Sequence, residues 1–120
     1  MTGLSGLRVF VVEDEGFVAL MIEDMLQEMG CEIAASVARL ASAREIAATA
    51  EIDLAILDVN LDGQPVFPVA EILRERQIPL VFSTGYGING LPREFTGHPV
   101  LGKPFSIVDL QKMMTLALRR

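Results

Sequence analysis

Charged and hydroxyl side chains follow four apolar stretches of this sequence, and their types suggest a chemistry. Asp58 ends the run "LAILD", and Glu13 and Asp14 follow "RVFVV". Thr84 comes directly after "IPLVFS", and Lys103 directly after "PVLG". A carboxylate that lies beside a divalent cation and an ammonium group can accept a phosphoryl group as an acyl phosphate. The question is therefore whether the fold brings these side chains into one cleft.

The apolar stretches themselves predict the strands of a sheet. They are short, rich in β-branched residues and bounded by polar or turn-forming residues, which is typical of buried strands. We predict five strands, at residues 8–12, 31–36, 53–58, 78–83 and 99–102.

Helical patterns fill most of the intervals between these strands. One helix is expected after "EDE" and up to Gly30, with an inner face of Val18, Met21, Ile22, Met25 and Met29. Others are expected over 38–50, from near Pro65 and Pro68, and over 106–120, the last with Ser106 as its N-cap and Asp109 completing the cap. Residues 84–98 hold so much glycine and proline that any helix there must be short or distorted.

The alternation of strand and helix predicts an α/β fold. Strands this apolar are buried on both faces, which indicates a parallel sheet with helices on each side. Right-handed crossovers then produce a doubly wound sheet. The carboxyl ends of its strands share one edge, where ligands bind. We therefore expect the acidic residues, Thr84 and Lys103 to meet there.

Three carboxylates in one cleft need a cation. Two carboxylates about 4 Å apart repel by about 4 kcal/mol at an effective dielectric constant of 20. Oxygen ligands of this kind suit Mg²⁺, which takes one or two carboxylates together with phosphate and water. Lys103 adds a further positive charge. Asp58 needs no general base as a nucleophile, because an ordinary aspartate is ionised at neutral pH.

Length and composition predict a single cytoplasmic domain that spans residues 1–120. The net charge of −6 argues against non-specific binding to nucleic acid or to an anionic membrane. Cys31 is the only cysteine, which fits a reducing compartment, and the sequence contains neither a signal peptide nor an apolar run of membrane-spanning length. The start "MTGLSG" favours a stand-alone protein over a domain excised from a larger one.

From about residue 7 to its end, the chain resembles the receiver domain of bacterial two-component response regulators. The matching motifs are "VVEDE", "LAILDVNLDG", "FSTG" and "GKPF", in the family's order and at the expected strand ends. The resemblance implies a flavodoxin-like (βα)5 fold with five parallel strands in the order 2-1-3-4-5. It also implies a phosphorylation-dependent signalling switch rather than a conventional enzyme.

The same resemblance implies roles for individual residues. Asp58 would accept a phosphoryl group from a sensor histidine kinase or a phosphotransfer protein. Asp14, Asp58 and the backbone carbonyl of Asn60 would bind Mg²⁺, with Glu13 acting directly or through water.

Thr84 and Lys103 would contact the phosphoryl group, and the peptide bond from Lys103 to Pro104 would be cis. Receiver domains also catalyse their own phosphorylation and dephosphorylation. A downstream protein partner would read the change.

Two features depart from the usual receiver pattern. Val100 stands three positions before the lysine, where the family usually has an aromatic switch residue. The stretch "VFSTGYG" is similar to the motif of the single-domain FAT GUY receivers, which also lack that aromatic residue. We infer that the glycine-rich loop 85–92 is the switching element.

Alternative readings remain. The chain could be a pseudo-receiver, a binding module that ignores phosphorylation. A phosphatase of the haloacid dehalogenase type would need an acid at position 60, where this chain has Asn60. "GYGING" matches a dinucleotide-binding pattern but lacks the helix that must follow it. Asp14 alone would usually be read as a helix cap.

Overall fold

The computed structural model describes residues 3–85 and 91–119, and its centre is a parallel sheet. Five strands lie in the order β2-β1-β3-β6-β7. With β6 and β7 counted as the fourth and fifth strands, this confirms the predicted order 2-1-3-4-5. The strands are β1 (Arg8–Val12), β2 (Glu32–Val37), β3 (Leu54–Asp58), β6 (Leu80–Thr84) and β7 (Val100–Gly102).

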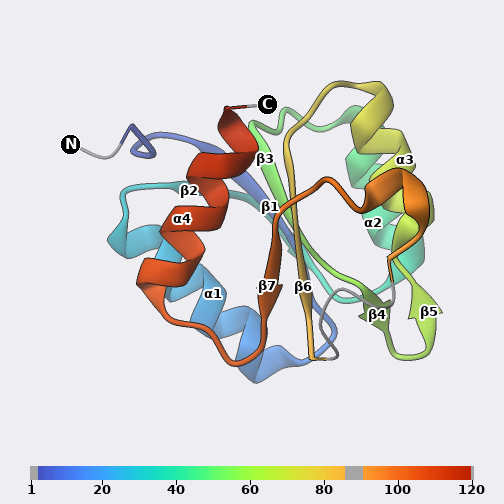
Figure 1. The fold of residues 1–120 in the computed structure, drawn as a ribbon, viewed down its shortest axis with the longest axis horizontal. Helices are drawn as coiled ribbons and strands as arrows, with labels where there is room; N and C mark the ends of the chain where they lie inside the picture. The colour runs from blue at the N-terminus through green and yellow to red at the C-terminus, as the bar shows by residue number, and fades with distance from the viewer. Residues whose placement is uncertain (1–2, 86–90, 120) are drawn as a thin grey trace.

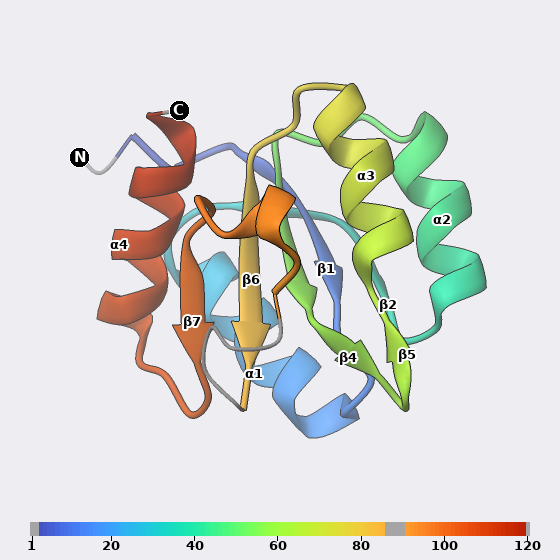
Figure 2. The same ribbon diagram turned by 45° about the vertical axis from the view of Figure 1, so that its right-hand side comes forward.

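Helices cover both faces of the sheet, as a doubly wound fold requires. Figure 1 shows α1 and α4 on one face and α2 and α3 on the other. The turned view in Figure 2 shows the strands ending together at the lower edge. The helices are α1 (Gly16–Glu28), α2 (Leu40–Thr49), α3 (Phe67–Glu75) and α4 (Ile107–Leu118).

Strand alternation divides the apolar residues into two cores. Phe10, Leu57 and Phe82 belong to the core that packs under α2 and α3. Val11 and Ile56 belong to the core under α1 and α4. Successive side chains of a strand point to opposite faces, so each central strand contributes to both cores. The central strands are therefore packed on both faces of the sheet up to the edge where the polar residues follow.

The helix boundaries follow local signals in most places. Ser106 accepts a hydrogen bond from the Asp109 amide at 3.2 Å, and the complete capping box confirms the predicted start of α4. Pro68 lies in the first turn of α3, as expected. The inner face of α1 differs from the prediction, because Met21 is exposed and Leu26 is fully buried.

The interval between β6 and β7 departs from a regular (βα)5 pattern. Its only helical turn among the residues that the structure describes is a 3-10 turn, η2 (Arg93–Phe95). Phe95 on this turn is fully buried, with its ring stacked on Phe67 and edge-on to Phe82. The guanidinium of Arg74 lies 4.7 Å from the centre of the Phe95 ring. The expectation that any helix here is short is thus confirmed for residues 91–98, and an aromatic cluster anchors the turn.

A small hairpin that was not predicted from the sequence follows β3. Strands β4 (Asn60–Leu61) and β5 (Gln64–Pro65) pair antiparallel. Asp62 and Gly63 form its turn, both with positive φ (50° and 87°), which is typical of a two-residue hairpin loop. Pro65 therefore lies in β5 rather than at the start of α3.

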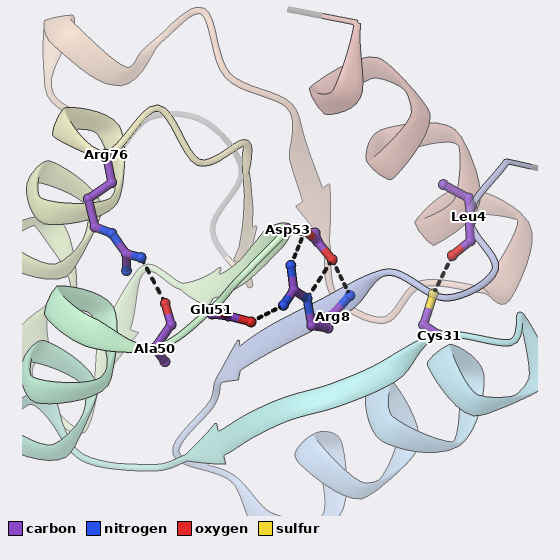
Figure 3. Close-up of polar contacts among 7 residues, drawn as sticks. All are labelled: Leu4, Arg8, Cys31, Ala50, Glu51, Asp53 and Arg76. Atoms are coloured by element: carbon purple, nitrogen blue, oxygen red, sulfur yellow. Dashed lines mark hydrogen bonds and ion pairs between the residues drawn. The ribbon is translucent and has the colours of Figure 1, made fainter.

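The edge of the sheet opposite the strand ends is held by ion pairs. Arg8 at the start of β1 donates hydrogen bonds from its side chain to both carboxylate oxygens of Asp53, each at 3.1 Å, and also pairs with Glu51. Arg76 donates to the carbonyl of Ala50 at 2.8 Å, at the end of α2 (Figure 3). The Arg8 guanidinium holds the pKa of Asp53 below its usual value. These contacts fix the strand starts, far from the candidate site.

None of the helices formed by the described residues is both long enough and apolar enough to cross a membrane.

Candidate functional site

The ammonium group of Lys103 joins the ends of three strands. Its Nζ lies 3.1 Å from Asp58 Oδ2 and 2.8 Å from Glu13 Oε1. Asp58 ends β3, Glu13 follows β1 and Lys103 follows β7. Asp58 and Glu13 are almost completely buried, with 5% and 2% of their surface exposed. The structure thus brings together side chains that are 45 or more residues apart in sequence.

Backbone amides hold the carboxylates in place. The amide of Asn60 donates to Asp58 Oδ1 at 3.2 Å, and the amide of Glu15 donates to Glu13 Oε2 at 3.2 Å. The amide of Asp62 donates to Asp14 Oδ2 at 2.8 Å. These amide donors were missed in the sequence analysis, because only the folded hairpin brings residue 62 to Asp14.

Asp14 does not cap the first helix. The N-cap of α1 is Glu15, and no side chain accepts a capping hydrogen bond there. The Asp14 carboxylate instead turns to the hairpin that follows β3. The reading of Asp14 as a helix cap is therefore wrong.

Burial changes the ionisation of Asp58. Desolvation, together with repulsion from Glu13, raises the pKa of Asp58 from 3.8 to about 7, although Lys103 acts in the opposite direction. The prediction that Asp58 ionises as an ordinary carboxylate is therefore wrong. Burial alone would lower the pKa of Lys103, but its hydrogen bond to Glu13 and the charge of Asp58 outweigh burial and raise it.

The acidic residues suit a divalent cation. Glu13, Asp14 and Asp58 each offer a carboxylate oxygen, and these three oxygens lie within 4.8 Å of one another. Lys103 supplies one positive charge against three carboxylates, which leaves the cluster with excess negative charge. An all-oxygen donor set with excess negative charge fits Mg²⁺. A bound cation would also favour the ionised form of Asp58.

A cleft of about 290 Å³ opens above these groups. Thr84 at the end of β6 lies in its wall and is 4% exposed. The backbone amide of Lys103 donates to the Thr84 carbonyl at 2.9 Å, which ties β7 to β6 beside the cleft. Every predicted site residue except Glu13 lines the cleft, namely Asp14, Asp58, Asn60, Thr84 and Lys103.

Val100 begins β7, and Lys103 directly follows the last residue of this strand. The Lys103–Pro104 peptide bond is cis, as the resemblance implied. Val100 is half-buried and packs against the core under α2 and α3. Of the loop 85–92, which we inferred to be the switching element, residues 86–90 lie outside the described residues.

A five-stranded parallel sheet with an acidic cluster and a lysine at its carboxyl edge defines a class of signalling domain. The family profile described as "Response regulator receiver domain" matches residues 9–115, and the chain belongs to this family.

Curated relatives extend beyond the matched region. The "Transcriptional regulatory protein PdtaR" of Mycobacterium tuberculosis is 33% identical over 117 residues, and the match covers 94% of this chain and 57% of the relative. The "Transcriptional regulatory protein GltR" of Pseudomonas aeruginosa is 30% identical, and 50% of its length is covered. This chain therefore spans about half the length of the curated relatives it matches.

Some solved structures match over nearly their whole length. SdrG from Sphingomonas melonis Fr1 is 38% identical with a TM-score of 0.85, and the match covers 96% of this chain and 98% of SdrG. The receiver domain of Erythrobacter litoralis PhyR is 26% identical with a TM-score of 0.78, covering 98% and 93%. The receiver domain of the Pseudomonas aeruginosa kinase PA1611, solved with magnesium in its cleft, shares the fold at 23% identity.

Proposed function

We propose that this protein is a phosphorylation-dependent signalling switch and that Asp58 is its phosphoacceptor. The observation that carries the proposal is the contact of Lys103 Nζ with both Asp58 and Glu13, at 3.1 and 2.8 Å, in an acidic cleft. Membership of the receiver family supports it. Neither a pure structural ion pair nor a helix cap explains why Lys103 contacts two buried carboxylates that have a third, Asp14, beside them.

Asp14, Asp58 and the carbonyl of Asn60 would hold a Mg²⁺ ion, with Glu13 acting directly or through water. When bound, Mg²⁺ offsets the negative charge that otherwise keeps a phosphoryl group away from a carboxylate. The 4.8 Å limit on the spacing of the three carboxylates supports this assignment.

Three side chains of the cleft would each have a separate role in phosphoryl transfer. One oxygen of Asp58 attacks the phosphorus atom, and the bond from phosphorus to the donor's nitrogen or oxygen breaks with its electron pair left on the donor. Lys103 would change its hydrogen-bond acceptor from an Asp58 oxygen to a phosphoryl oxygen as the negative charge moves there. The lysine thus keeps a charge-assisted hydrogen bond. The Thr84 hydroxyl contacts a second phosphoryl oxygen. The same groups would assist hydrolysis of the product.

The partners proposed are a sensor histidine kinase or phosphotransfer protein upstream and a protein target downstream. A single receiver domain over residues 1–120 in the cytoplasm suits both contacts. The net charge of −6 does not favour nucleic acid as the direct target.

The phosphorylated state would be read through the segment after β6 and through α4. Val100 offers no aromatic ring to rotate inward. Phe95 and His98, both packed against Phe82, connect this segment to the strand that ends at Thr84. A shift of Thr84 towards a phosphoryl group would therefore reach residues 91–98 through packed side chains.

Acetyl phosphate with Mg²⁺ provides the direct test. The wild-type protein should gain the mass of one phosphoryl group in intact-mass spectrometry, and chelation of Mg²⁺ should prevent this. Asp58→Asn should gain none. Asp24→Asn, a matched change on the exposed face of α1, should behave like the wild type. An adduct that persists in Asp58→Asn would contradict the proposal.

The pseudo-receiver remains a second candidate because Val100 replaces the usual aromatic residue. It predicts that a partner isolated with this protein binds equally well with and without beryllofluoride, a mimic of the phosphoryl group. The switch predicts a different affinity for the two forms.

A further inference from the structure

Ser83 is a buried hydroxyl that the proposed function does not use. It lies in β6 directly before Thr84 and is fully buried, with 0% exposure. Its Oγ has no hydrogen-bond partner within residues 3–85 and 91–119. An unpaired buried hydroxyl is costly, so native proteins rarely keep one without a reason.

The register of the sheet places Ser83 beside Asp58. Val11 pairs with Ile56, and Ile56 pairs with Val81, in the core under α1 and α4. Two residues further along a strand the side chain returns to the same face. Asp58 and Ser83 are direct partners in the β3–β6 ladder, and adjacent strands lie about 4.8 Å apart.

The side chain of Lys103 crosses the end of β6, next to this position. It follows β7, whereas its two carboxylate partners belong to β3 and to the end of β1. Strand β6 lies between β7 and β3, so the lysine side chain spans the end of β6. Ser83 pairs with Leu101 in β7, which belongs to the same core. Ser83 is therefore fully buried between its two ladder partners, Asp58 and Leu101.

Asp58 can accept a further hydrogen bond. Its Oδ1 accepts from the Asn60 amide and its Oδ2 from Lys103. A carboxylate has about four lone-pair positions, so acceptor capacity remains. The serine side chain has three staggered χ1 positions, and a change between them redirects the hydroxyl.

We propose that Ser83 is a positioning residue: a change of its χ1 angle lets the hydroxyl donate a hydrogen bond to the carboxyl group of phosphorylated Asp58, and this bond shortens the life of the phosphoryl adduct. This inference rests on the proposed function.

The chemical reason lies in the hydrolysis step. The oxygen of a water molecule bonds to phosphorus, and the bond from phosphorus to the Asp58 oxygen breaks. The electron pair stays on Asp58, which becomes a carboxylate again, and the water gives one proton to solvent. Negative charge therefore builds on the carboxyl oxygens, where the Ser83 hydrogen bond strengthens. The proton of Ser83 stays on Ser83.

The experiment follows loss of the adduct by intact mass after acetyl phosphate is removed, with Mg²⁺ present. Ser83→Ala should lose its phosphoryl group about two- to tenfold more slowly than the wild type, as expected for one lost hydrogen bond. Ser83→Thr keeps the hydroxyl and should restore most of the rate. Ser36→Ala, which removes a hydroxyl from the edge strand β2, should match the wild type.

An infrared measurement gives an independent result if Ser83→Thr fails to fold. A hydrogen bond lowers the stretching frequency of a carbonyl group, so the acyl phosphate carbonyl of Ser83→Ala should shift to higher frequency. An unchanged decay rate in Ser83→Ala, or an unshifted carbonyl band, overturns the inference alone. Absence of any adduct in the wild type overturns the proposed function as well.

Discussion

At the scale of single residues, the site is governed by the charge on Asp58. The residue is 5% exposed, faces Glu13 and is held by one lysine. Its environment therefore opposes the ionised form that a nucleophile requires. An environment that opposes ionisation is expected at a functional site, where residues are kept for reactivity although they lower stability.

The raised pKa of Asp58 makes a prediction about stability and pH. Its folded-state pKa is about 7 against an ordinary value of 3.8, so the folded protein binds a proton more tightly than the unfolded chain. The stability that depends on this proton is complete below pH 3.8 and is lost as the pH rises towards about 7. Asn does not titrate, so Asp58→Asn should not lose stability in this way as the pH rises.

We therefore expect the advantage of Asp58→Asn over the wild type, in free energy of unfolding, to grow across this pH window in chelator-containing buffer. Urea denaturation at several pH values measures it. Other titrating groups are common to both proteins, so their effects largely cancel. A difference that stays constant with pH would contradict the assignment.

At the scale of secondary-structure elements, the segment between β6 and β7 is the distinctive part of the molecule. A 3-10 turn stands there, and Phe95 fixes it to the sheet through Phe67 and Phe82. Arg74 of α3 adds a cation–π contact from outside. The packing of Phe95 therefore ties the turn to the sheet, in addition to the turn's own backbone hydrogen bonds from the amides of Phe95, Thr96 and His98.

Phe95→Ala should destabilise the protein by about 3 kcal/mol, because it removes a fully buried ring and leaves a cavity beside Phe82. Phe17→Ala is a matched control on α1, where the ring is 77% exposed. Its effect should stay within about 0.5 kcal/mol. Urea unfolding followed by circular dichroism measures both. Equal effects of the two variants would show that Phe95 does not anchor the turn.

At the scale of the whole molecule, the cleft links metal binding to folding, because its ligands come from strands far apart in sequence. The unfolded chain cannot assemble Glu13, Asp14 and Asp58 within 4.8 Å. Mg²⁺ should therefore raise the free energy of unfolding, by about 2.7 kcal/mol at a concentration about 100 times its dissociation constant.

Asp14→Asn should lose most of this Mg²⁺ effect, whereas Asp24→Asn should retain it. Thermal unfolding with increasing Mg²⁺ makes the comparison directly. A wild-type protein whose unfolding temperature does not respond to Mg²⁺ would remove the support for a metal centre, as would an unimpaired response in Asp14→Asn.

The sequence by itself determined the strands, the arrangement of helices on both faces of a parallel sheet and the edge at which the polar residues gather; the strand order was implied by the resemblance to receiver domains. Apolar strand patterns and chain order are local properties, and the handedness of crossovers converts them into a doubly wound sheet. The Ser106 cap and the Asp62–Gly63 turn were predictable for the same reason.

Only the tertiary structure decided which groups touch and how they ionise. Contacts between distant segments decide three features of the site. These are the hydrogen bond from the Asp62 amide to Asp14, the pKa of Asp58 and the register that places Ser83 beside Asp58. The aromatic cluster around Phe95 is of the same kind. Hydrogen bonding and desolvation depend on distances of a few ångströms, which residue types and spacing do not specify.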